Sequence, residues 1–323
     1  MGLTLKLGLL STARINEKLV AGARLVDEVE VVAIGSRDLG RAEAQASSLG
    51  VQRALGSYEA VLEDPDVDAV YVALPNSMHV DWSIRALEAG KHVLCEKPMA
   101  RSVEPVERAF DAAERAGRVL TEAFMWRHHP QARMLVDLLP RVGELRLIRA
   151  WFSFPIEGTG DLRQSAELEG GALMDVGCYC LSGARLVAGE PVELFGAQVT
   201  GGEGVDVRFT GVLRLESDVL ACFDCGIDMA GRYGLEVVGS EGAILLKDPW
   251  HSVEPELELR AADGSVEELQ AERIDPYACE LRNLAAAVAG EREPLLGRAD
   301  AVGQARAIAA LYRSAESGQM VVP

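Results

Sequence analysis

Two short motifs carry residues that together could catalyse a redox reaction at a hydroxyl-bearing carbon. The first, Glu96-Lys97-Pro98, follows a short apolar run, His92 to Cys95, typical of a strand that leaves a βα unit. The second runs from Gly170 to Tyr179 and contains Asp175. An ammonium group lowers the pKa of a neighbouring phenol, which can then exchange a proton with a substrate hydroxyl. These residue types suggest a nicotinamide oxidoreductase.

Asp175 and Tyr179 are four residues apart, so on a helix both would lie on one face. One side chain could then orient a substrate hydroxyl while the other handles its proton. Taken singly, each residue has a plainer explanation, because a helical tyrosine is usually a core residue and a lysine before proline is usually solvated. Their joint occurrence favours catalysis by Lys97 and Tyr179.

The elements that must position these motifs differ between the two parts of the chain. Residues 1–123 alternate short apolar runs with amphipathic segments, which predicts parallel βαβ units in a doubly wound sheet. We expect strands over 5–10, 29–34, 69–74, 92–95 and 119–121. We expect helices over 39–49 and 80–89, ended by Gly50 and Gly90, and another beginning near Ser102 and Pro105.

Residues 124–323 have a different pattern and predict a second domain of the α+β class. Apolar residues alternate with polar ones over 205–215 and over 148–154, as in antiparallel strands with one solvated face, and Asp206 is expected on that face. Helices are expected over 277–289 and 300–315. A sheet face that no helix covers must be buried against another subunit, so we expect a homodimer or homotetramer.

The first strand runs into a segment that could bind the pyrophosphate of a dinucleotide. Gly8 is expected at the tight turn, whereas Ser11 and Ala13 stand where further glycines are usual. The Ser11 and Thr12 hydroxyl groups could still donate to phosphate beside a helix N-terminus. The candidate cofactor loop therefore comprises Gly8, Ser11, Thr12, Ala13, Arg14 and Ile15.

The end of the second strand indicates which dinucleotide is bound. An NAD site usually places an acidic residue there, but this chain has Ser36-Arg37, which would suit the 2′-phosphate of NADP. Arg37 could instead cover the adenine face or pair with Asp38. The sequence favours NADP, with NAD as the second choice.

Two further segments are candidates for the ligand-binding edge of the sheet. Leu74-Pro75-Asn76 and His79 follow a strand, so Asn76 could hold a ribose or carboxamide group, although turn formation and helix capping would explain the same residues. Trp126 and Arg127 lie near the domain junction and could form a wall for the nicotinamide or the substrate, or pack between domains.

Composition excludes several other functions. The 323 residues carry a formal charge of −18 without a basic cluster, so no nucleic-acid partner is expected. The chain has no apolar run long enough to span a membrane and no signal peptide, which favours a cytoplasmic protein whose six cysteines are reduced. Cys222 and Cys225 would point to opposite faces of a strand, so no metal site is expected.

Taken in order, these motifs resemble the glucose-fructose oxidoreductase / inositol dehydrogenase (Gfo/Idh/MocA) family over nearly the whole chain. The resemblance implies an N-terminal Rossmann domain and a C-terminal domain whose open, mainly antiparallel sheet carries the substrate and the subunit contact. Lys97 matches the catalytic lysine of the family. Tyr179 stands where many members have histidine, which implies a tyrosine subgroup that includes D-xylose dehydrogenase and dimeric dihydrodiol dehydrogenase. Ser11, Ala13 and Glu169 depart from the usual glycine pattern.

The expected function is an NADP(H)-dependent oxidoreductase that acts on a sugar or related polyol. Tyr179 would transfer the proton, Lys97 would lower its pKa, and Asp175 with Arg163 would orient the substrate; Glu96 would contribute to the cofactor site. A trans-dihydrodiol dehydrogenase shares these residues but needs an apolar pocket. A non-catalytic dinucleotide sensor would keep the fold without turnover.

Overall fold

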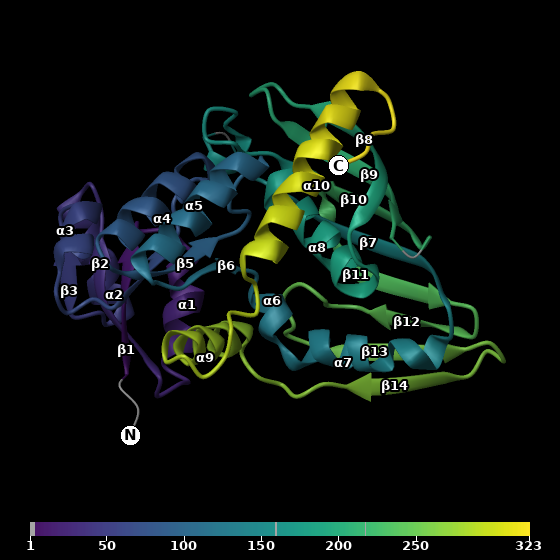
Figure 1. Cartoon of the computed structure of the whole chain (residues 1–323), viewed down its shortest axis with the longest axis horizontal. Coiled ribbons are helices and arrows are strands. Elements are labelled where there is room, and N and C mark those ends of the chain that lie inside the picture. Colours follow the sequence, from purple (N-terminus) through teal and green to yellow (C-terminus); the bar gives the residue numbers. More distant parts are fainter. Residues whose placement is uncertain (1–3, 159, 217) are drawn as a thin grey trace. The chain divides into compact units, whose positions relative to one another are not determined.

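The chain folds into two compact units, which we describe separately. The structure is a computed structural model and describes residues 4–158, 160–216 and 218–323. Unit 1 contains residues 1–100, 104–128 and 274–302, and unit 2 contains residues 101–103, 129–273 and 303–323 (Figure 1). Unit 1 is therefore built from three separate stretches of the chain, the last of which comes from the C-terminal part.

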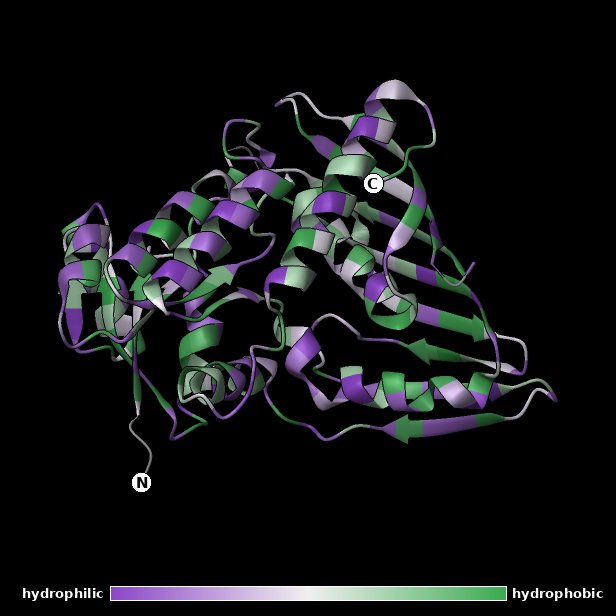
Figure 2. Cartoon of the chain, in the orientation of Figure 1, coloured by the Kyte–Doolittle hydropathy of each residue, from purple (hydrophilic) through white to green (hydrophobic). Residues whose placement is uncertain are grey.

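A six-stranded parallel sheet forms the centre of unit 1, as the sequence predicts. The strand order is β3-β2-β1-β4-β5-β6, the order of a Rossmann-type doubly wound sheet. The strands are β1 (Leu5–Leu10), β2 (Val29–Gly35), β3 (Arg53–Leu55), β4 (Ala69–Val72), β5 (His92–Glu96) and β6 (Leu120–Ala123). Strands β1 and β4 are almost wholly buried and apolar, and β5 is so in its centre, as a sheet covered on both faces requires (Figure 2).

Helices connect the strands of unit 1 and end where the sequence places left-handed glycines. They are α1 (Asn16–Ala23), α2 (Leu39–Leu49), α3 (Tyr58–Glu63), α4 (His79–Glu88), α5 (Val103–Ala116), α6 (Met125–His128) and α9 (Pro276–Val288), with a 3₁₀ turn at Asn76–Met78. Gly50 ends α2 with φ +60°, and Gly90 follows α4 with φ +79°. Asp38 caps α2 by accepting from the Arg41 N–H at 3.1 Å.

The position of Gly8 differs from the one predicted from the sequence. We expected it at the tight turn of the cofactor loop, but it lies within β1, where a Cβ atom would come within 2.5 Å of Val61 Cγ1 on α3. Gly35 at the end of β2 packs against the other methyl group of Val61, also at 2.5 Å. The prediction that Gly8 forms the phosphate-binding turn is wrong. The two glycines instead allow α3 to lie close to the sheet.

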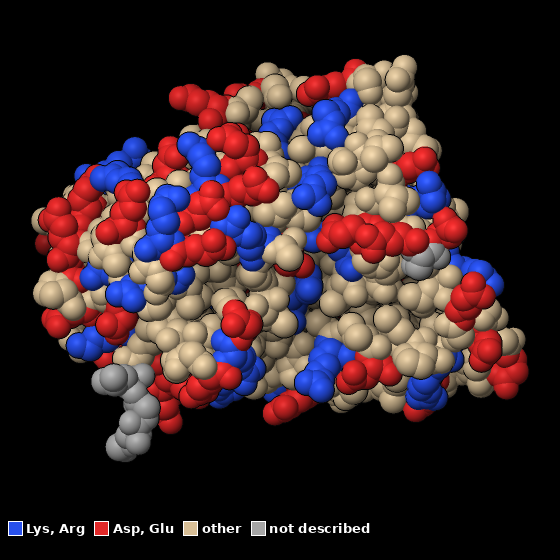
Figure 3. Space-filling view, viewed as in Figure 1, with Lys and Arg blue, Asp and Glu red and all other residues tan. Residues whose placement is uncertain are grey.

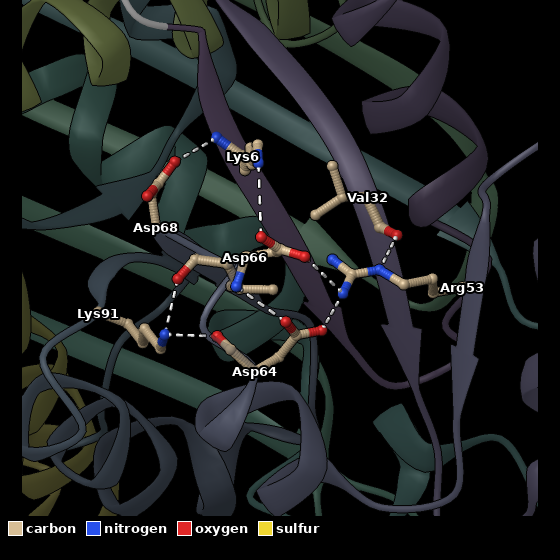
Figure 4. A network of polar contacts seen from close by, with 8 residues as sticks. Lys6, Val32, Arg53, Asp64, Asp66, Asp68 and Lys91 are labelled. Carbon is tan, nitrogen blue, oxygen red and sulfur yellow. Dashed lines mark hydrogen bonds and ion pairs between the residues drawn. The ribbon is translucent and has the colours of Figure 1, made fainter.

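A polar network joins the amino ends of the parallel strands (Figure 4). Arg53 Nη1 lies 2.5 Å from Asp64 Oδ2, and the Asp64 side chain also accepts from the Asp66 N–H at 2.9 Å. Lys91 Nζ donates to the carbonyls of Asp64 and Val67 at 2.8 and 2.7 Å. Ligands of such sheets bind at the carboxyl ends of the strands, so this network stabilises the opposite edge.

Unit 2 contains an eight-stranded, mainly antiparallel sheet, again as predicted. Its strand order is β14-β13-β12-β11-β7-β10-β9-β8. Among the strand pairs described in this sheet, only β7–β10 is parallel. The strands are β7 (Leu145–Pro155), β8 (Pro191–Thr200), β9 (Asp206–Leu215), β10 (Leu220–Gly226), β11 (Asp228–Gly239), β12 (Gly242–Leu246), β13 (Glu256–Ala261) and β14 (Val266–Gln270).

Helices pack on one face of this sheet. The helical segments are α7 (Pro130–Leu138), α8 (Cys178–Ala188), the C-terminal part of α10 (Arg298–Ser317), a π-helix (Leu173–Gly177) and 3₁₀ turns at Leu139–Val142 and Leu162–Gln164. Figure 1 shows α8 and α10 in front of strands β7 to β10. In β9, Phe209 and Leu213 are buried on the helix side while Thr210 and Val212 are exposed, which confirms the predicted alternation.

Asp206 is the exception in that strand. The alternation places it on the solvated face, but it is only 4% exposed, so the prediction for this residue is wrong. Its carboxylate accepts two hydrogen bonds from other parts of unit 2, which compensate for its burial.

The surface is acidic without a single charged patch on the face shown. Acidic and basic side chains are interspersed there, as expected for a net charge of −18 with dispersed acidic residues (Figure 3). Over the ranges 4–158, 160–216 and 218–323, no helix is long and apolar enough to cross a membrane.

Candidate active site

The segment after β1 adopts a glycine-like conformation without a glycine. Ser11 has φ +107°, a region that L-residues rarely occupy. Its hydroxyl donates to the Ala73 carbonyl at 2.6 Å and accepts from the Ala13 N–H at 3.2 Å, while its own N–H donates to the Gly35 carbonyl. These bonds compensate for backbone strain of about 1–3 kcal/mol. The Ser11 hydroxyl therefore holds the loop and does not point freely at a ligand.

Two amides that the sequence analysis did not single out fix the rest of this loop. Asn16 Nδ2 donates to the Ser11 carbonyl and to Gln45 Oε1, both at 2.9 Å, and Gln45 Nε2 donates to the Ala13 carbonyl at 3.1 Å. Thr12, Arg14 and Ile15 lie between these anchors. Helix α1 has no side-chain cap at its N-cap, Ile15. The N–H groups of its first turn donate to the carbonyls of Ala13, Arg14 and Ile15 at 3.2, 3.1 and 3.0 Å, so this end of the helix offers an anion its dipole and not unpaired N–H groups.

Ser36 and Arg37 lie at the carboxyl end of β2, as predicted. Ser36 is buried, and its hydroxyl accepts from the Asp38 N–H at 3.2 Å, which leaves the O–H free to donate. Arg37 is exposed and makes no ion pair with any residue that the structure describes. The alternative pairing of Arg37 with Asp38 is not observed, since Asp38 caps α2. A free guanidinium and a hydroxyl donor fit a 2′-phosphate.

His79 fixes two loops at the edge of the sheet. Its Nδ1 lies 2.9 Å from the Pro98 carbonyl and its Nε2 lies 2.8 Å from the Leu74 carbonyl, with the ring 1% exposed. The pKa of His79 is lowered to about 4, mainly by burial; the two carbonyls oppose the shift and the positive charge of Lys97 contributes to it. The ring nitrogens are thus engaged by the backbone. A direct cofactor contact by His79 stays a prediction, as do the contacts of Pro75 and Asn76.

The Glu96-Lys97-Pro98 segment is held by buried acidic residues. Glu96, the last residue of β5, accepts from the Tyr71 hydroxyl and, at 3.3 Å, from the Lys97 N–H. Glu122 on β6 accepts from the Met99 N–H at 2.6 Å. The Lys97-Pro98 peptide is cis. The backbone on both sides of Lys97 is therefore anchored within unit 1, which fixes the origin of its side chain.

A second carboxyl group, on α9, is affected by the charge of Glu96. Glu280 is buried, and burial raises its pKa well above the usual range, with the charges of Glu96 and Asp275 acting in the same direction. Burial also raises the pKa of Tyr71, and the Glu96 charge adds to that effect. Burial and the two neighbouring charges thus all favour the protonated form of Glu280.

Trp126 and Arg127 are both engaged within unit 1. Trp126 is 1% exposed, and the Arg127 guanidinium lies 5.7 Å from the centre of its ring. Arg127 Nη1 also pairs with Asp300 Oδ1 at 3.4 Å. A role for Trp126 and Arg127 as a nicotinamide or substrate wall stays a prediction. The adjacent His129 caps α7 through Nδ1, which accepts from the Gln131 N–H at 3.1 Å.

In unit 2 the predicted catalytic cluster lies on a π-helix that continues into α8. Two glycines allow the chain to enter this helix. Gly171 has φ +122°, and a Cβ atom at Gly170 would lie 2.3 Å from the Arg163 carbonyl oxygen. The Gly171 N–H donates to that carbonyl at 2.9 Å. Glu169, which stands beside only these two glycines, has φ +55°. The glycine pair thus brings the Arg163 loop against the start of the π-helix.

Arg163 is placed beside Asp175 by this contact. Its guanidinium makes two bonds to the Asp161 carboxylate, at 2.8 and 2.9 Å, and Nη1 lies 3.4 Å from Asp175 Oδ2. Hydrogen bonding to Asp161 raises the pKa of Arg163, and the charge of Asp175 adds to the shift. The guanidinium also lies 5.0 Å from the Phe154 ring centre. Asp175 and Arg163 therefore form a charged pair that can bind hydroxyl groups.

Tyr179 lies one helical turn after Asp175, with an aromatic environment. Its ring contacts Phe152 edge-on, with centroids 5.4 Å apart, and Trp250 at 6.1 Å. The ring is 7% exposed. The backbone directly before it is anchored by Gln304, whose Nε2 donates to the Cys178 carbonyl at 2.7 Å. Such packing fixes the ring orientation, which a proton-transferring phenol needs.

Each unit thus assembles part of the predicted site. Unit 1 brings together the Ser11 loop, the Leu74 carbonyl and the Lys97 segment through Ser11 and His79. Unit 2 brings together Arg163, Asp175 and the aromatic residues around Tyr179. Asn16, Gln45 and Glu122 contribute supporting hydrogen bonds that no local motif indicates.

Comparison with known proteins identifies the family to which both parts of the chain are similar. Residues 8–124 match the family model of the GFO_IDH_MocA oxidoreductase family with an NAD-binding Rossmann fold, and residues 132–245 match the GFO/IDH/MocA C-terminal domain. D-xylose 1-dehydrogenase (NADP(+)) 2 of Haloferax volcanii is 39% identical over 97% of this chain and 98% of its own length. A trans-1,2-dihydrobenzene-1,2-diol dehydrogenase of Danio rerio is 32% identical over 77% of this chain and 75% of its own.

A solved structure also matches almost the whole chain. A 3-ketoreductase from Actinomadura kijaniata, crystallised with NADP and TDP-benzene, superimposes with a TM-score of 0.91 at 32% identity, covering 97% of this chain and 98% of its own. That enzyme has also been crystallised with one tyrosine changed to phenylalanine and with one lysine changed to alanine or glutamate. The two family models and the near-complete alignments agree with the Rossmann sheet and the antiparallel sheet, and the chain belongs to the Gfo/Idh/MocA oxidoreductase family.

Proposed function

We propose that this protein is an NADP(H)-dependent oxidoreductase that transfers a hydride between nicotinamide and a hydroxyl or carbonyl carbon of a sugar or related polyol. The observation that carries the proposal is the cluster on the π-helix and α8, where Asp175 is paired with Arg163 and Tyr179 follows one turn later. Relatives named as a xylose dehydrogenase and a 3-ketoreductase support a sugar substrate.

Tyr179 and Lys97 serve the proton transfer in this proposal. A phenol with an unperturbed pKa near 10 is a poor base at neutral pH, so a neighbouring ammonium group must lower it. Lys97 supplies that charge and polarises the reacting oxygen. Asp175 and Arg163 orient the hydroxyl groups of the substrate. The anchored backbone around Lys97 and the packed Tyr179 ring supply the required rigidity.

The cofactor residues form a site whose chemistry fits NADP. Arg37 and Ser36 would bind the 2′-phosphate, and the segment of Thr12, Ala13, Arg14 and Ile15 would receive the pyrophosphate at the positive end of the α1 dipole. The bound nicotinamide supplies the hydride acceptor or donor. Leu74, Pro75, Asn76 and Glu96 would contribute to the nicotinamide side of that site.

The cofactor preference is tested by titration. NADPH should bind at least about tenfold more tightly than NADH, a difference of roughly 1.4 kcal/mol. Arg37→Ala should remove most of that difference, whereas Arg41→Ala, a matched change on the exposed surface of α2, should not. Equal dissociation constants in the unmodified protein would contradict the NADP assignment.

Turnover separates the candidate functions. The reduced cofactor is followed by absorbance after NADP⁺ is mixed with aldoses, inositols or a trans-dihydrodiol. Oxidation of a sugar supports the proposal. Oxidation of the dihydrodiol alone would favour the second candidate, which the Danio rerio relative and the aromatic residues around Tyr179 support. Cofactor binding without turnover of any of these substrates would favour a sensor.

Variants then test the proton-transfer roles. Tyr179→Phe removes only the phenolic hydroxyl group, and with it the exchangeable proton, while Lys97→Met keeps the stem without the charge. Each should lower kcat by about 10² to 10⁴ while fluorescence quenching by NADPH persists. Near-full activity of Tyr179→Phe on the identified sugar would refute the proposed role.

We also propose that the protein is a homodimer, alone or within a tetramer, formed through the outer face of the unit 2 sheet. Val199, Val212 and Leu220 on that face are 47%, 42% and 50% exposed. Arg214 beside them is already paired with Glu193 at 3.1 Å, so a second copy could cover this part of the face without leaving that charge unpaired. Light scattering should give a dimer mass that Val212→Arg reduces to a monomer.

The division into domains and the cellular location are also part of this proposal. The division into an NADP-binding domain of residues 1–123 and a substrate-binding and oligomerisation domain of residues 124–323 is approximate, since residues 274–302 belong to unit 1. A cytoplasmic location also remains a proposal, and fractionation of the producing cells would test it.

A further inference from the structure

A buried carboxylate caps the helix that carries the proposed catalytic cluster. Asp206 lies at the start of β9 and is 4% exposed. Its Oδ2 accepts from the Leu173 N–H at 2.7 Å, at the first residue of the π-helix. The N-cap residue of that helix, Ala172, has no side chain that could make this bond. Asp206 therefore supplies from another strand the acceptor that a local capping residue usually provides.

The fit around this carboxylate is close. A Cβ atom at Gly171 would lie 2.2 Å from Asp206 Oδ1, so the chain needs glycine where it passes the carboxylate. Burial raises the pKa of Asp206 to about 6, although the bonds from Leu173 and Tyr312 oppose the shift. Burial of a carboxylate costs free energy, which the hydrogen bonds from Leu173 and Tyr312 must offset in the native state.

The second oxygen of Asp206 connects it to α10 and to the segment after Lys97. Oδ1 accepts from the Tyr312 hydroxyl at 2.8 Å. The Arg101 guanidinium lies 3.7 Å from the centre of the Tyr312 ring, and its charge favours the ionised form of Asp206. Arg101 is four residues after Lys97, in the short stretch 101–103 that belongs to unit 2.

We propose that Asp206, with Tyr312 and Arg101, is a positioning group for catalysis. Through the Leu173 N–H it sets the start of the π-helix, and with it the placement of Asp175 and Tyr179. Through Tyr312 and Arg101 it holds the end of the segment that carries Lys97. None of these three residues need touch substrate or cofactor. The inference rests on the proposed function, in which Tyr179 exchanges the substrate proton.

Three variants test this role with the sugar that gives turnover and with NADP⁺. Asp206→Ala removes both contacts and should lower kcat about 10- to 100-fold, as expected for a small displacement of reacting groups. The dissociation constant for NADPH should stay within about twofold, because the cofactor residues lie in unit 1. Asp206→Asn keeps an oxygen for the Leu173 N–H and can donate to Tyr312, so it should restore kcat to within about threefold of the unmodified enzyme.

A merely structural role predicts a different result. Asp206→Ala would then lower the unfolding temperature but leave the kcat of the folded enzyme unchanged, and that outcome would overturn the proposal. If Asp206→Ala does not fold, Tyr312→Phe removes a single hydroxyl from the same network. It should lower kcat about three- to tenfold without changing NADPH binding, and an unchanged kcat would again overturn the proposal.

Tyr179→Phe keeps this test distinct from that of the function itself. If Tyr179→Phe retains activity, the proposed function fails, whatever Asp206 does. If Tyr179→Phe is inactive while Asp206→Ala and Tyr312→Phe turn over normally, the function stands and only the positioning role fails.

Discussion

The buried His79 ring should make the stability of this protein depend on pH in a way that one substitution removes. Both ring nitrogens face backbone carbonyls, at 2.8 and 2.9 Å, and burial lowers the pKa of the ring to about 4 from an ordinary 6.5. The folded state therefore favours the neutral ring. Above pH 6.5 the ring is neutral in both states and its contribution to stability is fully present. Below pH 6.5 the unfolded chain takes up the proton first, so stability is lost until the pH passes about 4.

The size of the effect follows from this shift. The difference between 6.5 and about 4 corresponds to about 3 kcal/mol over the whole range. Between pH 7.5 and 5.5, a range in which the enzyme can be handled, the same linkage gives a loss of about 1.3 kcal/mol. Other histidines with a lowered pKa, such as His92 and His128, titrate in the variants as well, and their contributions cancel in the comparison.

Two variants isolate the titration from the hydrogen bond. His79→Leu removes both, whereas His79→Gln removes the titration but keeps a donor for one carbonyl. The free energy of unfolding is measured by urea denaturation with tryptophan fluorescence at pH 7.5 and 5.5. The unmodified protein should lose about 1.3 kcal/mol more than either variant between these pH values. The Gln variant should be the more stable of the two, and it should keep more activity because Pro98 remains held beside Lys97. Equal losses in all three proteins would refute the reasoning.

Three further results are expected. Gly8→Ala should destabilise the protein by about 1–3 kcal/mol, because its Cβ would meet Val61 at 2.5 Å, and Val61→Ala in the same chain should recover part of the loss; an unchanged unfolding temperature of the single variant would contradict the packing role. Asp64→Asn should lower stability by about 1 kcal/mol at neutral pH without changing kcat, because it weakens the Arg53 pair at the amino edge of the sheet, and a lower kcat would argue against that separation. Arg163→Met should raise KM for the sugar about tenfold with NADPH binding unchanged, as steady-state kinetics and fluorescence titration would show; an unaltered KM would remove Arg163 from the substrate site.

Local patterns in the sequence predict most of the fold. The strand over 5–10 and the helix over 39–49 have the predicted ends, because an apolar run and a left-handed Gly50 mark them. Strand β3 was missed, since three half-buried residues at the edge of a sheet form no apolar run. The predictions failed where a contact with a residue far away in the sequence determines the position of a side chain or turn. Gly8 was assigned to a turn because the sequence does not show that Val61 packs on it.

The candidate site divides in the same way. Residue types and spacing indicated Lys97, Asp175 and Tyr179, and the helical relation between the last two is present, though on a π-helix that leads into α8. The supporting hydrogen bonds join residues far apart in the chain. Asn16 with Gln45 is one example, and the Met99 N–H with Glu122 is another. The prediction for Asp206 was wrong because it used only the alternation of polar and apolar residues along the strand. That pattern does not show that the distant Leu173 N–H, at the start of the π-helix, needs an acceptor.

The return of α9 to unit 1 has a consequence for how the protein is made. Helix α9 packs against α1, where a Cβ atom at Gly22 would lie 2.7 Å from Tyr277 Cβ, and it buries Ala278, Leu281 and Leu284. A ribosome completes residues 1–128 long before it adds residues 274–302. During synthesis, the surface of unit 1 that α9 covers therefore stays exposed until residues 274–302 have been made. A gene fragment that stops at residue 123 should yield a protein that associates or needs a chaperone, and fusing residues 274–302 to it should restore a stable module.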